Sequence, residues 1–148
     1  MAHPDPKQVV DFDELDQRTQ TLIKQATAAR MQAYAPYSKF QVGAALRTDK
    51  KTVYTGCNIE SKVYSPTICA ERTAICKAVS EGQRNVVEIA IVAQQDDYFT
   101  TPCGVCREVL SEFGSPDMDV YMTKPDMKEV LHVKLSDLLP LAFVGPFQ

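Results

Sequence analysis

The sequence predicts an α/β protein, a three-layer α/β/α sandwich with a mixed central sheet. Helical and strand-like patterns alternate along the chain, and no repeat, low-complexity tract or long linker divides it. The length of 148 residues suits one domain, and a hydrophobic fraction of 45% is enough to build a core. We therefore expect residues 1–148 to form a single domain, with residues 1–10 loosely ordered.

The first half of the chain is predicted to contain a helix, a hairpin and a second helix. Residues 11–33 have an amphipathic helical pattern that should end before Pro36, since a residue preceding proline avoids the α region. Apolar and other residues alternate over 40–47, and a polar turn at 48–51 leads to a returning strand at 52–56. A helix should then run from about Cys69 to Glu81, where Gly82 stops it.

The second half of the chain is predicted to contain three strands and two helices. The apolar run at 86–93 is typical of a strand covered on both faces. A short helix at 104–113 should end at Gly114, and strands are expected at 118–123 and 129–135. We expect Ser136 to cap a terminal helix that stops at Pro140.

Charge and composition exclude several classes of function. The formal net charge of −3 argues against a protein that binds long nucleic acid, which needs a basic face. No run of 18 apolar residues is present, so no membrane span is expected. The N-terminus lacks the basic and apolar regions of a secretory signal. We therefore expect a cytoplasmic protein whose five cysteines are reduced and available to a metal.

Three cysteines lie in two short motifs that carry metal-binding chemistry. The first motif is Cys69-Ala70-Glu71, and the second is Pro102-Cys103-Gly104-Val105-Cys106, each at the expected start of a helix. Cys103 and Cys106 are three residues apart and so share one helical face. Three thiolates and a water make a tetrahedral zinc site with one open position, which is the catalytic pattern. The motifs therefore predict one Zn²⁺ per chain.

The other potential metal ligands are less well placed. Cys76 follows Cys69 by seven residues, which puts it ~10.5 Å further along a straight helix, so we expect it in the core instead. Cys57 lies before the helix, and spacing leaves it open as a fourth ligand. His3 should lie in a loose terminus, and His132 on a strand, both far from the motifs in sequence.

Two charged residues beside the first cysteine have candidate roles. Helical side chains lean toward the N-terminus of the helix, so Glu71 can reach the space beyond its first turn, where the metal would lie. A carboxylate there can act as a general acid and base without binding the metal. Arg72 could donate hydrogen bonds to the thiolates, or it could be an ordinary surface arginine.

These motifs resemble those of the zinc nucleoside deaminases, whose signature is H-x-E, or cysteine for histidine, followed by P-C-x-x-C. Four stretches, at 37–46, 56–60, 67–74 and 102–107, occur in the order found in the small homotetrameric cytidine deaminases. The resemblance extends from about Thr19 to Pro146. It implies hydrolytic deamination of cytidine and 2′-deoxycytidine in pyrimidine salvage, by a homotetramer whose active sites are shared between subunits.

The resemblance also implies roles for individual residues. Cys69, Cys103 and Cys106 would bind Zn²⁺, and Glu71 would move protons. Asn58 and Glu60 match the pair that holds the ribose. Phe40 matches a residue that lines the nucleoside pocket, and Ala70 one whose backbone lies near the base. Phe143 is the candidate for an aromatic ring that stacks over the base in a neighbouring subunit. A carboxylate at the ribose would repel a 3′-phosphate, which favours a free nucleoside as substrate.

Two alternatives remain open at this point. The chain departs from the family pattern at Ser61, Lys62, Ser65, Pro66 and Glu108, and its tail reads Phe143-Val144-Gly145-Pro146. These changes leave room for a deaminase of the same fold that acts on another aminonucleoside, such as an antibiotic or a modified base. A non-catalytic module with a structural zinc would need a fourth protein ligand, for which Cys57 is the candidate.

Overall fold

The structure, a computed structural model, describes residues 5–146 and contains a six-stranded sheet with the strand order β1-β6-β5-β4-β2-β3. β4 and β5 are parallel, and the other neighbouring pairs are antiparallel, so the predicted mixed sheet is confirmed. The strands are β1 (Val9–Asp11), β2 (Val42–Thr48), β3 (Val53–Cys57), β4 (Val86–Ala93), β5 (Gly114–Thr123) and β6 (Glu129–Lys134). The α-helices are α1 (Gln17–Arg30), α2 (Ala70–Ser80), α3 (Gly104–Phe113) and α4 (Leu135–Leu138).

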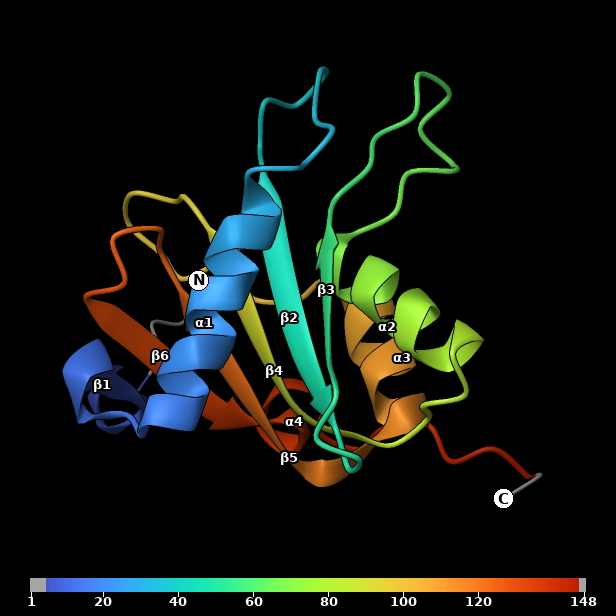
Figure 1. Cartoon of the computed structure of the whole chain (residues 1–148). Coiled ribbons are helices and arrows are strands. Elements are labelled where there is room, and N and C mark those ends of the chain that lie inside the picture. Colours follow the sequence, from blue (N-terminus) through green and yellow to red (C-terminus); the bar gives the residue numbers. More distant parts are fainter. Residues whose placement is uncertain (1–4, 147–148) are drawn as a thin grey trace.

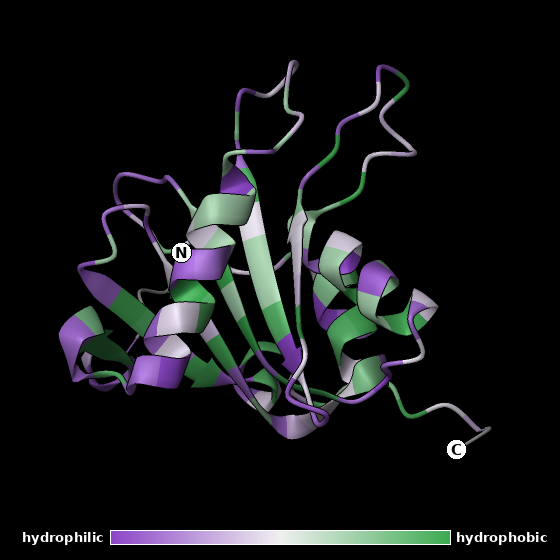
Figure 2. Cartoon of the chain, in the orientation of Figure 1, coloured by the Kyte–Doolittle hydropathy of each residue, from purple (hydrophilic) through white to green (hydrophobic). Residues whose placement is uncertain are grey.

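Helices cover both faces of the sheet, as the three-layer prediction requires (Figure 1). On one face, Ala45 of β2 packs in a cluster with Leu22 and Ile23 of α1. On the other face, Ala44 and Leu46 of β2 pack in a second cluster with residues of α2, α3 and α4. Apolar residues therefore lie on both sides of the central strands, and the ribbons of these strands are mostly green in Figure 2. The strand predicted at 86–93 coincides with β4, and the predicted hairpin is β2–β3.

Two glycines let helices approach the sheet closely. A Cβ at Gly43 in β2 would lie 2.1 Å from the backbone oxygen of Ala26 in α1. A Cβ at Gly56 in β3 would lie 2.4 Å from the backbone oxygen of Ala70, the first residue of α2. Because backbone atoms cannot move aside as a flexible side chain can, these positions fix how near α1 and α2 sit to the strands.

The N-terminal segment differs from its prediction. The expected helix at 11–33 is α1 over Gln17–Arg30, preceded by a 3₁₀ turn at Phe12–Glu14 and by β1. Asp16 ends the non-helical segment, because its carboxylate accepts hydrogen bonds from the backbone of Arg18 and Thr19 and so caps α1. Within the segment that was expected to be loose, Pro6–Gln8 form a 3₁₀ turn, and Val9 and Val10 belong to β1, which pairs with β6. Residues 1–4, including His3, lie outside the described part of the chain.

The C-terminal elements differ in smaller ways. β5 begins at Gly114 rather than at 118, since the chain enters the sheet directly from α3. The cap of α4 is Lys134 and not Ser136, because the carboxylate of Asp137 accepts a hydrogen bond from the Lys134 backbone N–H. Within residues 5–146, none of the helices combines the length and apolar composition needed to cross a bilayer.

Candidate metal centre and active site

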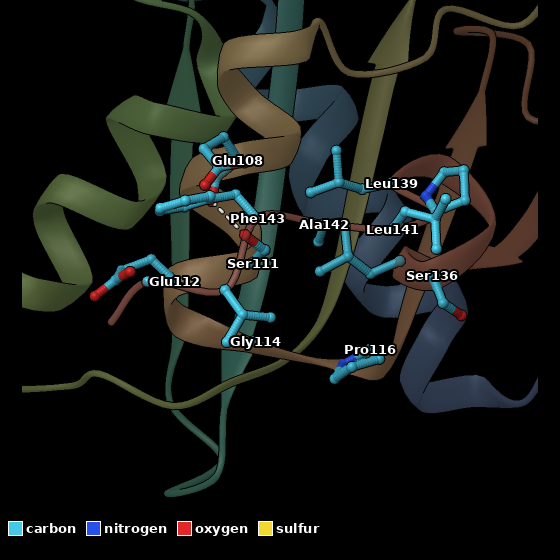
Figure 3. A pocket seen from close by; sticks show the side chains of 14 residues that line it. Glu108, Ser111, Glu112, Gly114, Pro116, Ser136, Leu139, Leu141, Ala142 and Phe143 are labelled. Atoms are coloured by element: carbon cyan, nitrogen blue, oxygen red, sulfur yellow. Dashed lines mark hydrogen bonds between the residues drawn. The ribbon is translucent and has the colours of Figure 1, made fainter. Parts of the chain in front are cut away.

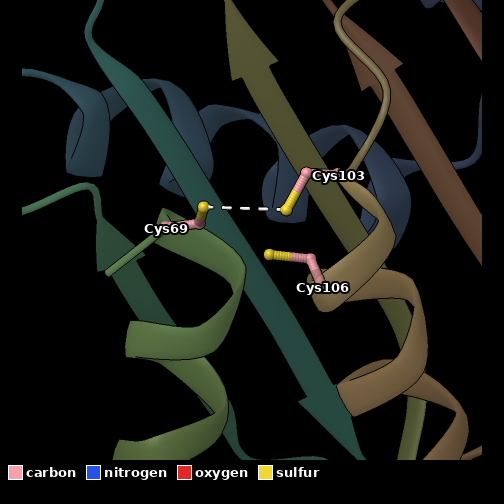
Figure 4. A group of neighbouring side chains, drawn as sticks. All are labelled: Cys69, Cys103 and Cys106. Carbon is pink, nitrogen blue, oxygen red and sulfur yellow. Dashed lines mark hydrogen bonds between the residues drawn. The ribbon is translucent and has the colours of Figure 1, made fainter. Parts of the chain in front are cut away.

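Three cysteine side chains from two helices meet at one point. The Sγ atoms of Cys69, Cys103 and Cys106 all lie within 4.8 Å of one another, and those of Cys69 and Cys103 are 3.9 Å apart. Figure 4 shows Cys69 at the start of α2, Cys103 at the start of α3 and Cys106 within α3, with the sulfur atoms facing a common centre. Cys106 is buried, Cys69 is partly buried, and Cys103 is exposed, so the cluster is open to solvent on the Cys103 side.

The helix ends explain why the sulfurs converge. Cys69 and Cys103 are the residues immediately before the first turns of α2 and α3, and both have extended backbones. Neither side chain caps its own helix, so both Sγ atoms remain free to bind a ligand. The unpaired N–H groups and the positive dipole ends of two helices lie at the thiolates and stabilise their negative charge. The predicted position of both motifs at helix starts is confirmed.

The sulfur cluster fits a Zn²⁺ ion. Thiolates bound at ~2.3 Å in a tetrahedron lie ~3.8 Å apart, which matches the 3.9 Å between Cys69 and Cys103. A disulfide would instead require ~2.05 Å between the two sulfurs. Among residues 5–146, no histidine, aspartate, glutamate or further cysteine joins the group. The protein therefore supplies three ligands of one Zn²⁺ per chain, and a fourth position is left for water or substrate.

The remaining cysteines and His132 lie elsewhere. Cys57 ends β3, where it pairs with Gly43, and it is not part of the sulfur cluster. Cys76 is exposed on α2, so the prediction of a core position is wrong. The helical face of Cys76 points away from the sheet, which an estimate of axial spacing could not reveal. His132 lies on β6 as predicted, and its Nε2 is 2.7 Å from Oδ1 of Asp119.

Glu71 lies in the first turn of α2 and is almost completely buried, with 4% of its surface exposed. Burial raises the pKa of this carboxyl to about 7, and the charge of the neighbouring Cys69 adds to the effect. A carboxyl with a pKa near neutrality can both accept and donate a proton at physiological pH. Its position therefore suits proton transfer beside the sulfur cluster.

Arg72 contacts the sulfur cluster, and this excludes the surface-arginine alternative. Its Nη2 donates to Sγ of Cys69 across 3.6 Å, and its buried Nε has no hydrogen-bond partner among the described residues. Hydrogen bonds from Cys106 and Arg72 lower the pKa of the Cys69 thiol to about 5. A thiolate is thus present at Cys69 at neutral pH, the form that a metal requires.

Glu60 and Asn58 lie where two long loops meet, at 31–41 and 58–68 (Figure 1). The carboxylate of Glu60 accepts hydrogen bonds from the backbone N–H groups of Tyr37 and Ser38 and from the Ser38 hydroxyl. The hydroxyl hydrogen bond is the main reason that the pKa of Glu60 is held below its ordinary value. The side chain of Asn58 accepts from the Val42 N–H and donates to the Phe40 carbonyl. Glu60 is therefore ionised at neutral pH. The two hydrogen bonds of Asn58 connect its loop to the end of the loop at 31–41.

A cavity of about 430 Å³ opens beside Glu60. Its lining consists of Tyr37, Ser38, Glu60, Ser61, Tyr64 and Thr67. Of these residues, Glu60 was predicted from the sequence as a ribose ligand, whereas no role was predicted for the two tyrosines. Both tyrosines lie in irregular loops, and nothing in the spacing showed that the two loops meet.

None of the other predicted substrate residues, Phe40, Ala70 and Phe143, lines this cavity, although the Phe40 backbone N–H donates to the hydroxyl of Ser38, which does. Phe40 is half-buried and packs against the core cluster that contains residues of α2, and Ala70 begins α2 next to Cys69. Phe143 is 74% exposed and lines a separate cavity of about 780 Å³ between α3 and the C-terminal segment (Figure 3). None of the three cysteines lines that larger cavity.

The fold and the site together define a zinc-dependent deaminase, in which three thiolates and a nearby buried carboxyl follow the C-x-E and P-C-x-x-C pattern. Residues 16–122 match the family model described as "Cytidine and deoxycytidylate deaminase zinc-binding region". The chain belongs to this family of deaminases.

Individual relatives agree with this assignment. The chain is 51% identical over 124 residues to a cytidine deaminase from Sporosarcina psychrophila, an alignment that covers 82% of this chain and 88% of the relative. The crystal structure of a cytidine deaminase from Burkholderia pseudomallei superposes with a TM-score of 0.80 at 42% identity, covering 87% of this chain and 100% of that one. A blasticidin-S deaminase from Bacillus cereus is 29% identical over 136 residues, which are 87% of this chain and 94% of that protein.

Proposed function

We propose that this chain hydrolyses cytidine and 2′-deoxycytidine to uridine and 2′-deoxyuridine with release of ammonia, as a cytoplasmic enzyme of pyrimidine salvage. The observation that carries the proposal is the cluster of Cys69, Cys103 and Cys106 beside the buried Glu71. Similarity to cytidine deaminases at up to 51% identity supports the choice of substrate over the aminonucleoside antibiotic, whose deaminase is 29% identical.

Deamination requires two groups, the metal ion and the carboxyl of Glu71. When bound, Zn²⁺ supplies the Lewis acidity that makes a water molecule a nucleophile at neutral pH. Glu71 accepts a proton from the water that attacks C4 of cytosine. The same carboxyl then donates a proton to N3 and delivers one to the departing amine, so that water and cytidine give uridine and ammonia. Because the pKa of Glu71 is raised to about 7, its carboxyl can both accept and donate the proton at neutral pH.

Arg72 supports the metal site without contacting the substrate. Three thiolates and a divalent cation sum to one negative charge, which weakens the metal as a Lewis acid. The Arg72 guanidinium withdraws charge from Cys69 through its hydrogen bond, and the two helix N-termini act in the same direction.

The ribose would be held by the loops at the cavity beside Glu60. The Glu60 carboxylate accepts the 3′-hydroxyl. Asn58, whose side chain is hydrogen-bonded to Val42 and Phe40, contributes its amide to the sugar. An ionised carboxylate repels a 3′-phosphate, so a free nucleoside is preferred over an interior residue of a polynucleotide. Phe40 lines the base pocket, and the backbone of Ala70 in the first turn of α2 offers hydrogen bonds to the base.

A neighbouring subunit completes the site in this proposal. The chain assembles as a homotetramer, and Phe143 of one subunit stacks over the base bound by another. The 74% exposure of Phe143, and its place in a cavity that none of the three cysteines lines, support this role. Exposed apolar side chains at Tyr37, Val63 and Tyr64 give a second copy a surface to cover.

A substrate panel tests the proposal. Ammonia release is measured with cytidine, 2′-deoxycytidine, cytidine 3′-monophosphate, adenosine and blasticidin S, alongside sedimentation of the active protein. We expect turnover of the two free pyrimidine nucleosides by a tetramer. Greater turnover of blasticidin S or adenosine would reject the substrate assignment, and an active monomer would reject the role of Phe143.

A further inference from the structure

Arg107 connects the loop that presents Cys103 to the C-terminal helix. Its Nε donates to the carbonyl of Pro102 at 2.7 Å, and its Nη1 donates to the carbonyl of Leu138 at 2.7 Å. Its Nη2 donates to the Thr101 hydroxyl at 3.0 Å. One planar guanidinium therefore holds two consecutive residues before Cys103 and the last residue of α4, which lies 31 positions away in sequence.

The position of Cys103 needs such support. The chain reaches Cys103 through an irregular segment at 94–102, and the Cys103 side chain makes no capping hydrogen bond that would fix it to α3. The carbonyl of Pro102 belongs to the peptide that joins it to Cys103, so the Arg107 hydrogen bond orients that peptide. Pro102 itself is buried, and it has no N–H through which it could be held in another way.

We propose that Arg107 is a positioning residue that sets the place of the Cys103 sulfur for the metal, using the C-terminal carbonyl of α4 as a fixed anchor. The role rests on the proposed zinc chemistry of the site, but it concerns metal retention rather than the identity of the substrate. Groups that orient metal ligands commonly change metal affinity about 10- to 100-fold when they are removed.

The chemistry of arginine suits this role better than that of lysine. All three acceptors are neutral oxygens, and they lie around the plane of one rigid fork of donors. Lysine offers a single nitrogen on a flexible chain, which cannot reach a hydroxyl and two carbonyls from separate segments with the same geometry. The conservative substitution Arg107→Lys should therefore retain only part of the effect.

The test measures release of zinc from the loaded protein to a chromogenic chelator, at a temperature well below the melting temperatures of all variants. We expect Arg107→Gln to release zinc about 10- to 100-fold faster than the unchanged protein, and Arg107→Lys to fall between them. Arg84→Gln is the matched control, because Arg84 is exposed on the loop after α2 and should leave the release rate unchanged. Equal release rates in Arg107→Gln and the unchanged protein would overturn the proposal.

A second readout separates positioning from a general loss of stability. With Co²⁺ in place of Zn²⁺, the thiolate-to-metal absorption bands should shift in Arg107→Gln, because the Cys103 sulfur is less well placed. Unchanged bands, with only a lower melting temperature, would show that Arg107 is a structural brace and would reject the role.

If Arg107→Gln does not fold, Arg107→Lys and Thr101→Val replace it, and unchanged zinc release in both would equally reject the role. If the unchanged protein holds zinc but does not deaminate cytidine, the proposed function fails, whereas faster release from the Arg107 variants still supports the positioning role.

Discussion

The Sγ atoms of Cys69 and Cys103 lie 3.9 Å apart although 34 residues separate them in the chain. They meet because α2 and α3 both begin on the same side of the sheet, and each helix has a cysteine as the residue before its first turn. The site therefore depends on where these two helices begin.

The first prediction concerns Glu71. Glu71→Gln keeps the size and burial of the side chain but cannot take up the proton, so cytidine deamination should fall by about two to four orders of magnitude. Zinc content and the circular dichroism spectrum should stay unchanged. Glu14→Gln, at an exposed position in the N-terminal 3₁₀ turn, is the control. Substantial turnover by Glu71→Gln would assign proton transfer to another group.

The second prediction uses two glycines near the metal. Gly56→Ala places a methyl group 2.4 Å from the Ala70 backbone oxygen, so the start of α2 must move together with Cys69. We expect loss of zinc and a marked fall in melting temperature. Gly104→Ala, next to Cys103, meets no atom within 4 Å and should keep zinc and activity. The reverse result for the two variants would contradict the described packing of α2 on β3.

The elements with strong local patterns were predictable from the sequence. The apolar run of β4, interrupted only by Glu88, predicted that strand within one residue, since burial on two faces selects apolar residues. The cysteines before α2 and α3 mark the helix starts, which were predicted equally closely. β1 was missed because Val9–Asp11 is only three residues long and is stabilised by pairing with β6, which local sequence does not show. Phe12 and Leu15 made the predicted helix too long, because their spacing fits a helical pattern. In the structure they precede α1 and pack in the same apolar cluster as its buried residues.

The candidate site was predictable to a similar extent. Spacing placed Cys103 beside Cys106, and helix geometry placed Glu71 near Cys69. That these residues form one metal site followed from the ligand chemistry of zinc and from the resemblance to the deaminases. The contact of Ser38 with Glu60 did not, because it joins two loops 22 residues apart and depends on their tertiary arrangement. The triple contact of Arg107 also escaped prediction, since its acceptors are backbone carbonyls and a hydroxyl on separate segments.

The third prediction concerns substrate choice at Glu60. Glu60→Gln removes the negative charge but keeps an acceptor oxygen, so repulsion of a 3′-phosphate should weaken while the 3′-hydroxyl is bound less tightly. The ratio of kcat/KM for cytidine to that for cytidine 3′-monophosphate should fall about tenfold or more. Zinc content should not change. An unchanged ratio would place the 3′-oxygen away from Glu60.

The fourth prediction concerns the N-terminal cap of α1. Hydrogen bonds from Thr19 hold the pKa of Asp16 below its ordinary 3.8, so the carboxylate stabilises the fold above that pH and loses this contribution as the pH falls through the lowered value. Asp16→Ala should therefore cost about 1 kcal/mol of unfolding free energy at pH 7. The difference from the unchanged protein should shrink in acid.

Urea unfolding of both proteins at neutral and acidic pH checks this prediction. Each comparison is made at one pH, so that any loss of metal in acid affects the two proteins alike. A difference that stays the same or grows as the pH is lowered would contradict the assignment of Asp16 as an ionised cap.

The most direct test of the central claim measures zinc content and cytidine turnover on the same sample, before and after chelation and after return of Zn²⁺. We predict one zinc per chain, loss of turnover in proportion to the zinc removed, and recovery when Zn²⁺ is restored. Turnover that persists in metal-free protein would contradict the account.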